Sequence, residues 1–381
     1  MARTLILGGG FGGISIATEL RRELGDDHEV VLVDRREGFF MGLRKLWELV
    51  GIGTIDDGSR SREMLDAHGI RFLQQEVTAI DPGRRAASLD GETLDGDHLV
   101  VALGAEPRAD LVPGLDEHGF NAWARPEIPK LAAALEEFDG GRLAIAIAGV
   151  PYKCPPAPYE LSMLLEEWLR GRGLRDATEL SVTTLQPMLL PNAGKEGSVW
   201  VGEQLDERGI AHAAGRKIDH VDDRKVLFED GELEFDLLIG VPPHRPPKVV
   251  AESALAGEGG WIKVDPGTLA TGHDGTYAVG DCTAIKLANG LPMPKAGIVA
   301  ELEGTRVAAA IAADLRGEPE PPPFDGRGYC FIEMGRAKAS LVEGEFFAEP
   351  EPSVNVREPS ADNAEEKRRF EAERLERWFG K

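Results

Sequence analysis

The sequence has few cysteines and few aromatic residues. Only Cys154, Cys282 and Cys330 occur among its 381 residues, and aromatic residues make up 6%. Three thiols that lie so far apart along the chain are too few for a structural zinc site. In a reducing compartment, cysteines are rarely structural cross-links. We therefore expect no metal and a redox role for at least one thiol.

The sequence also lacks a surplus of basic residues, a membrane-spanning segment and a signal peptide. The sequence has 43 Lys and Arg residues and 66 Asp and Glu residues, which gives a net charge of −23. This charge disfavours nucleic acid as a partner. No run approaches the ~20 apolar residues of a spanning helix. The first apolar stretch begins almost at Met1, so we expect a cytoplasmic protein. The length allows two domains.

The N-terminus carries a dinucleotide-binding pattern. An apolar strand, Thr4–Leu7, runs into Gly8-x-Gly10-x-x-Gly13, a helical pattern follows, and the next strand ends at Asp34. The first glycine allows the tight turn, the second lets the backbone approach a pyrophosphate, and the third lets helix and strand pack closely. The acid at the end of the second strand is placed to accept hydrogen bonds from ribose hydroxyls. We predict a βαβ unit with a bound dinucleotide.

The strand–loop–helix–strand order then repeats, but the second loop differs. An apolar strand at 142–149, a helix over Tyr159–Arg170 and a strand over Glu179–Leu185 form the second unit, and its loop contains Cys154 among four prolines. Prolines lack the backbone N–H groups that a pyrophosphate needs. A cysteine before a helix and next to Lys153 is favoured as a thiolate. We therefore predict that this unit lost its nucleotide site and that Cys154 is redox-active.

Further motifs resemble known flavoproteins. The segment 276–281 resembles the strand and Gly-Asp motif with which FAD enzymes of the glutathione-reductase type hold the ribityl chain, and 102–104 resembles their turn between domains. The segment 154–160 looks like the active-site segment of the flavoprotein subunit of flavocytochrome c sulfide dehydrogenase. The motifs at 241–243 and 292–297 follow in that family's order. From residue 1 to about 345, the sequence is similar to that subunit and to sulfide:quinone oxidoreductases.

The resemblance implies an α/β fold with two Rossmann-like dinucleotide-binding domains and a small C-terminal region of strands and a helix. The FAD-binding domain comprises 1–107 and 241–318, the second domain with its degenerate NAD site is 108–240, and the C-terminal region is 319–381. Lys295 resembles the lysine that stabilises the anionic reduced flavin. The implied FAD-binding residues are Gly8, Gly10, Phe11, Gly12, Gly13, Asp34, Arg35, Val77, Ala102, Gly104, Gly280, Asp281, Lys295 and Gly297.

The resemblance also implies a redox-active pair, Cys154 and Cys330, beside the flavin. Sulfide, or a related small sulfur species, would open the disulfide, and electrons would pass through FAD to a quinone. Glu160 is a candidate acid/base, or a carboxylate that complements a helix dipole. Cys282, next to the Gly-Asp motif, is interpreted as a small buried residue.

Other interpretations stay open at this level. A type II NADH dehydrogenase shares the implied fold but needs the second glycine loop, a related enzyme would act on other thiols or persulfides, and a non-enzymatic flavin-binding sensor or subunit would only bind a partner. The charged C-terminal segment 365–381 has Ala372, Leu375, Trp378 and Phe379 on one helical face. That face suits either peripheral contact with a membrane or docking on the protein itself or in a homodimer.

Overall fold

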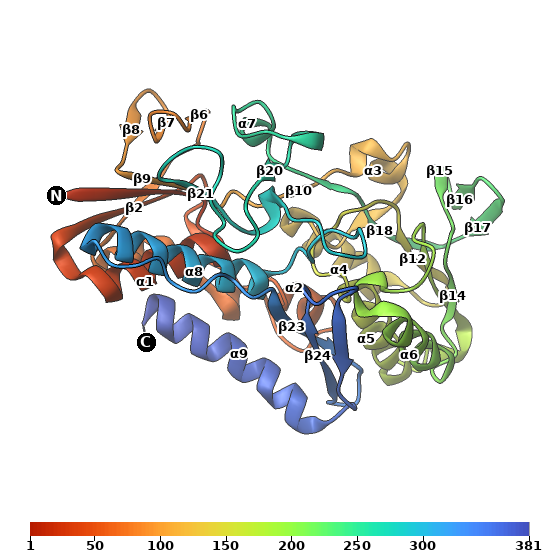
Figure 1. The fold of residues 1–381 in the computed structure, drawn as a ribbon. Helices are drawn as coiled ribbons and strands as arrows, with labels where there is room; N and C mark the ends of the chain where they lie inside the picture. Colours follow the sequence, from red (N-terminus) through yellow and green to blue (C-terminus); the bar gives the residue numbers. More distant parts are fainter. Residues whose placement is uncertain (381) are drawn as a thin grey trace.

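The computed structural model describes residues 1–380, and its centre is formed by two five-stranded sheets (Figure 1). The first is parallel and has the strand order β21-β9-β1-β2-β5. The chain leaves this sheet after β9 and returns to it at β21, so segments on both sides of the second unit share one sheet. Its strands are β1 (Ala2–Leu7), β2 (His28–Asp34), β5 (Ile70–Gln74), β9 (His98–Val101) and β21 (Thr276–Ala278).

Two long helices pack together beside the first sheet. α1 (Phe11–Leu24) turns its apolar positions inward and lies against α8 (Gly297–Arg316). A Cβ atom on Gly304 of α8 would lie 2.8 Å from the carbonyl oxygen of Gly12, closer than such atoms normally approach. The two helix backbones therefore touch at a glycine, which holds the start of α1 in a fixed position.

The second sheet repeats the arrangement, as the sequence predicted. It is parallel, with the order β11-β18-β12-β13-β14. Parallel strands with helical crossovers define the predicted α/β class, which is confirmed. Its elements are β11 (Phe120–Asn121), β12 (Gly141–Ile147), β13 (Thr178–Thr184), β14 (Ala211–Ala213), β18 (Leu237–Val241), α4 (Ile128–Glu137), α5 (Ala157–Gly171) and α6 (Gly194–Asp206).

Shorter elements connect and border the two sheets. The short helices are α2 (Arg44–Leu49), α3 (Leu115–His118) and α7 (Lys248–Ala251). The pairs and three-stranded sheets are β3 (Gly38–Phe40) with β4 (Ser59–Ser61); β6 (Ala79–Asp81), β7 (Ala86–Ser88) and β8 (Thr93–Asp95); β10 (Glu106–Pro107) with β19 (His244–Arg245); β15 (Ile218–Asp222), β16 (Lys225–Phe228) and β17 (Gly231–Glu234); and β20 (Ile262–Lys263) with β22 (Thr283–Ala284).

The C-terminal region is an antiparallel sheet followed by one long helix. The strands are β23 (Arg327–Glu333), β24 (Ala339–Glu345) and β25 (Ser353–Val356), and the helix is α9 (Ala361–Phe379). Figure 1 shows α9 returning from this sheet alongside α1 and α8.

The apolar face of α9 is buried against the rest of the chain. Trp378 is fully buried and lies edge-on to the rings of Phe11 and Phe39, at centroid distances of 5.3 and 5.7 Å. Leu375 and Phe379 are buried in the same core, whereas Ala372 is exposed. The large side chains of this face are covered by the protein itself, as the docking alternative requires, whereas contact with a membrane or with a second copy stays a prediction. Across residues 1–380, each helix is too short or too polar to cross a bilayer.

Replacing Trp378 tests how firmly α9 is docked. The Trp378→Ala variant should lose about 3–5 kcal/mol of unfolding free energy, because it removes a fully buried indole and leaves a cavity. Urea denaturation followed by circular dichroism measures this loss. Glu373→Ala, on the exposed side of the same helix, is the control and should change the unfolding free energy by less than about 0.5 kcal/mol. Equal stability of the two variants would show that α9 is not docked as described.

Candidate functional site

The glycine loop between β1 and α1 has the geometry of a phosphate cradle. A Cβ atom on Gly13 would overlap the carbonyl oxygen of Gly8, and one on Gly8, at φ +107°, would overlap that of Ala102. Gly10, in contrast, has open space within 4 Å of its Cβ position. A pyrophosphate fits this opening because the N–H groups and dipole of α1 face it. The residues predicted from the sequence thus fit the dinucleotide part of FAD.

Asp34 closes the loop from the end of β2. Its carboxylate accepts hydrogen bonds from the N–H groups of Gly9 and Arg36, both at 2.9 Å. Burial would raise the pKa of Asp34, but the Arg62 and Arg36 guanidinium groups outweigh it and hold that pKa below its usual value. Arg62 is itself buried and donates to the carbonyl oxygen of Gly9 at 2.8 Å. Sequence patterns missed Arg62, because it lies in a short irregular helix without a motif.

A pocket at the start of α8 gathers the second group of predicted cofactor residues. Gly280, Asp281 and Lys295 line it. The Lys295 ammonium donates to the carbonyl oxygens of Asp281 and Thr283, at 2.8 and 3.1 Å. Burial lowers the pKa of Lys295. This ammonium group has no carboxylate among its hydrogen-bond partners, so it suits a ligand that becomes anionic on reduction.

The remaining predicted cofactor residues differ in their surroundings. Gly104, at φ +68°, opens onto free space, and Gly297 packs its backbone against the ring of Phe11. Arg35 is exposed and forms ion pairs with Glu106 and Glu76, so its side chain does not reach the glycine loop. Val77 is buried in the core of the first sheet. The side chains of Arg35 and Val77 therefore serve ion pairing and core packing, respectively.

Glu303 of α8 is a further buried group that sequence reasoning did not single out. It accepts a hydrogen bond of 2.6 Å from the N–H group of Gly280. Burial raises the pKa of Glu303 to about 7. No motif marks this residue, since an acid inside a helix is usually exposed.

The two predicted redox cysteines lie together. The Sγ atoms of Cys154 and Cys330 are 4.0 Å apart, although 176 residues separate them in the chain. Cys154 lies in the loop before α5 and Cys330 on β23. Both are free thiols here, and a disulfide would bring the two sulfur atoms to about 2.05 Å. The structure thus brings together the two cysteines whose pairing the family resemblance implied.

The loop of Cys154 replaces the second nucleotide loop. Cys154 has φ +56°, a left-handed conformation that is rare for residues other than glycine. Its N–H group donates to the carbonyl oxygen of Lys295 at 2.7 Å, so the thiol is fixed beside the cofactor-binding residues. A Cβ atom on Gly149 would overlap the ring of Pro243. A pyrophosphate lacks both the space and the N–H donors that it would need here.

A buried ion cluster adjoins the cysteine pair. The Lys367 ammonium, from α9, forms ion pairs with Glu160 of α5 and Glu333 of β23, the latter at 3.3 Å. The three side chains are less than a tenth exposed. Burial raises the pKa of Glu160, and the attraction of two carboxylates raises the pKa of Lys367 despite burial. Glu160 is thus an ion-pair partner of Lys367, and the interpretation as a simple dipole-complementing carboxylate is incomplete.

The thiols differ in acidity. The hydrogen bond between the two thiols lowers the pKa of Cys154, and the Lys367 and Lys45 ammonium groups add to this effect. The same hydrogen bond and burial raise the pKa of Cys330. Cys154 is therefore the better thiolate of the two.

The prediction that Lys153 supplies the positive charge at Cys154 is wrong. The Lys153 ammonium points to the carbonyl oxygen of Ala105, at 3.2 Å, and does not contribute to the shifted pKa of Cys154. The left-handed turn at Cys154 sends neighbouring side chains in different directions. The cations that act on Cys154 come from α2 and α9, which no local motif could reveal.

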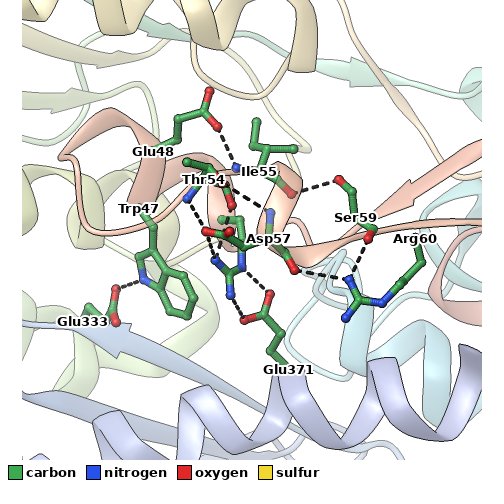
Figure 2. A network of polar contacts seen from close by, with 10 residues as sticks. Trp47, Glu48, Thr54, Ile55, Asp57, Ser59, Arg60, Glu333 and Glu371 are labelled. Atoms are coloured by element: carbon green, nitrogen blue, oxygen red, sulfur yellow. Dashed lines mark hydrogen bonds and ion pairs between the residues drawn. The ribbon is translucent and has the colours of Figure 1, made fainter. Parts of the chain in front are cut away.

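Polar contacts tie α2 to the C-terminal region (Figure 2). The indole N–H of Trp47 donates to Glu333 at 2.6 Å, and Arg44 makes a bidentate pair with Glu371 of α9, at 2.6 and 2.7 Å. These contacts hold α2, β23 and α9 together around the ion cluster.

An apolar pocket reaches Cys330. It has a volume of about 40 Å³ and is lined by Pro155, Pro156, Leu190, Asn192, Ala193, Pro294, Ala296, Val299, Tyr329, Cys330, Val342 and Phe346. Cys154 does not line it. Cys282, by contrast, is fully buried, and burial raises the pKa of its thiol to about 12. It is the small structural residue that the sequence suggested.

Known proteins share this architecture. Residues 2–145 match the model of the pyridine nucleotide-disulphide oxidoreductase family. The mitochondrial sulfide:quinone oxidoreductase of Dictyostelium discoideum is 26% identical over 371 residues, which cover 93% of this chain and 80% of that protein. The crystal structure of the sulfide:quinone oxidoreductase of Aquifex aeolicus superposes with a TM-score of 0.90 at 23% identity, covering 100% of this chain and 92% of that one.

The chain is similar to sulfide:quinone oxidoreductases over most of its length. The expected two-Rossmann fold, FAD as cofactor and the class of FAD-dependent oxidoreductase are confirmed with it. A type II NADH:quinone oxidoreductase of Staphylococcus saprophyticus is also similar, with 23% identity over 336 residues that cover 83% of each chain. The chain is therefore similar both to sulfide:quinone oxidoreductases and to type II NADH:quinone oxidoreductases. Only the geometry of the site can distinguish these two activities.

The open space at Gly10 gives a direct test of the FAD cradle. Gly10→Ala should fold normally, because among the described residues no atom beyond its chain neighbours lies within 4 Å of the new methyl group. It should retain much less FAD, because the methyl group occupies the space of the pyrophosphate. The ratio of flavin absorbance to protein measures FAD retention, and circular dichroism checks the fold. Gly171→Ala, equally open at the end of α5, is the matched control with full FAD content. Normal flavin content in Gly10→Ala would contradict the assignment.

Proposed function

We propose that the protein oxidises sulfide, or a related small sulfur species, through the pair Cys154 and Cys330 and passes the electrons through FAD to a quinone. The 4.0 Å distance between the two Sγ atoms carries this proposal. The two thiols lie at the loop that would bind the second nucleotide in an NADH-oxidising enzyme of this fold. The backbone N–H group of Cys154 also donates a hydrogen bond to the carbonyl oxygen of Lys295. The names of the relatives, which include sulfide and quinone, support both the donor and the acceptor.

The difference in acidity sets the direction of the first step. In the oxidised enzyme, hydrosulfide attacks the sulfur of Cys330, a new S–S bond forms there, and the bond between the cysteines breaks. Cys154 leaves as the thiolate, because the thiol of lower pKa is the better leaving group. The apolar pocket that reaches Cys330 gives the substrate access to that sulfur. The product of this step is a persulfide of Cys330.

The second step transfers the electrons. The Cys154 thiolate and the Cys330 persulfide together lose one proton and two electrons and join through the substrate sulfur. FAD, held by the glycine loop and Lys295, supplies the two-electron acceptor. The 4.0 Å separation of the thiols leaves room for one bridging sulfur, because two S–S bonds of about 2.05 Å that meet at a bent sulfur span roughly 3.3 Å.

Glu160 receives the proton released in this sequence. Its carboxylate is buried beside both thiols and bound to Lys367, which keeps it oriented. Its raised pKa makes it a stronger base than an exposed glutamate.

The principal alternative is oxidation of NADH, as the similarity to type II NADH:quinone oxidoreductases suggests. The proline-rich loop and Pro243 speak against it, since they take the place of a pyrophosphate. The same observations support sulfur over a nicotinamide as the electron donor.

Anaerobic titration tests the proposal. About one equivalent of sulfide per flavin should bleach the flavin absorbance of the wild-type holoenzyme, since each sulfide delivers two electrons. Cys154→Ser and Cys330→Ser should show no bleaching on the same timescale, while Cys282→Ser, a change at the third and structural cysteine, should bleach like the wild type. Rapid bleaching by NADH, or unchanged bleaching by sulfide in Cys154→Ser, would overturn the proposal.

Removing the carboxylate tests the role of Glu160. Glu160→Gln keeps the shape of the side chain but loses the base, so flavin reduction by sulfide should slow by about 100-fold or more. Stopped-flow absorbance measures the rate. Glu167→Gln, on the solvent-facing side of the same helix, serves as the control. A rate within about twofold of the wild type in Glu160→Gln would exclude Glu160 as the acceptor of the proton.

A further inference from the structure

Lys45 of α2 is a lysine that the mechanism above does not use, although it is close to Cys154. Its ammonium group donates to the carbonyl oxygen of Trp123 at 3.3 Å. The indole N–H of Trp123 donates in turn to the carbonyl oxygen of Lys153, the residue before Cys154, at 2.7 Å. Trp123 is buried and lies edge-on to Tyr152. One rigid side chain therefore fixes both the ammonium group and the cysteine loop.

The charges around Cys154 show what this arrangement does. The titratable groups that interact with the thiol include Cys330 from β23, Glu160 from α5, Lys367 from α9, Lys45 from α2 and Tyr152 from the same loop. Lys367 is shared by Glu160 and Glu333, so the ion cluster contributes two carboxylates and a single ammonium. Without another cation, a thiolate on Cys154 would lie beside a net negative charge, which disfavours it.

Lys45 supplies that cation. The charged groups that act on it are Lys153 and Cys154, and no carboxylate is among them. The positive charge of Lys45 therefore acts on the Cys154 thiol and is not neutralised by a carboxylate.

We propose that Lys45 is a positioning residue whose ammonium group stabilises the thiolate of Cys154. This inference rests on the proposed function in one respect, namely that Cys154 is the thiol that leaves as a thiolate. Lys45 belongs to the N-terminal half of the chain and Lys367 to the last helix, so opposite ends of the sequence supply the two cations.

The effect depends on pH in a defined direction. Burial, together with the nearby Lys153, lowers the pKa of Lys45 to about 7. The ammonium is present below that pH and is lost above it. Its support for the thiolate therefore acts at neutral and lower pH and disappears as the solution becomes basic.

Alkylation of the reduced holoenzyme measures the thiolate directly. Iodoacetamide is added anaerobically after removal of the reductant, and peptide mass spectrometry quantifies the modified Cys154. At pH 6.5, Lys45→Met should be alkylated about tenfold more slowly than the wild type, as expected for a pKa that rises by about one unit when a nearby cation is lost. Lys45→Arg should restore the rate to within about twofold.

Two controls keep the test decisive. Lys153→Met removes the neighbouring lysine, whose ammonium points elsewhere, and should not slow alkylation. At pH 9.5 the wild type and Lys45→Met should react at similar rates, because Lys45 is then neutral. A tenfold slower reaction of Lys45→Met at both pH values would indicate a change of access and would overturn the proposal, as would an unchanged rate at pH 6.5 or equal slowing in Lys153→Met.

The outcome is separate from that of the proposed function. Alkylation involves neither sulfide nor quinone, so failure of flavin bleaching would refute the function and leave the role of Lys45 intact. Conversely, normal bleaching with unchanged alkylation in Lys45→Met would refute only this inference.

Discussion

The ammonium group of Lys367 lies between the carboxylates of Glu160 and Glu333, out of contact with solvent. Glu160 follows Cys154 by six residues on the next helix, and Glu333 follows Cys330 by three residues on the same strand. One lysine therefore joins the two segments that carry the thiols and anchors the last helix to both. Removal of one partner would leave an uncompensated buried charge, which is strongly destabilising. The position of the thiol pair thus depends on this cluster.

The cluster also explains why the C-terminal helix belongs to the site. Its apolar residues pack against Phe11, at the start of the helix that cradles the dinucleotide, and its Lys367 reaches the thiols. Arg44 and Trp47 bind the same region from the N-terminal half of the chain. The cofactor loop and the cysteine pair are therefore held by one connected set of contacts. In the proposed mechanism, a cysteine pair held in this way would stay in a fixed position relative to the cofactor-binding loop.

Much of this could be predicted from the sequence, because some signals are local. The glycine spacing and Asp34 define the first nucleotide unit, and the prolines around Cys154 show that the second loop had changed. The pairing of Cys154 with Cys330 was predicted only from family resemblance, since two cysteines 176 positions apart in the sequence carry no distance information. The direction of Lys153 was predicted wrongly, because adjacency in sequence does not fix direction in a left-handed turn. Arg62, Lys45 and Lys367 carry no motif, and only tertiary packing brings them to the site.

The central claim is that substrate sulfur enters the protein at the cysteine pair, on Cys330. Peptide mass spectrometry of the oxidised holoenzyme, mixed with one equivalent of sulfide and quenched rapidly with an alkylating agent, tests it most directly. We expect one additional sulfur atom on the Cys330 peptide, or bridging it to the Cys154 peptide, and none on the Cys282 peptide. Additional sulfur on Cys154 alone, or none on either cysteine while the flavin becomes reduced, would contradict it.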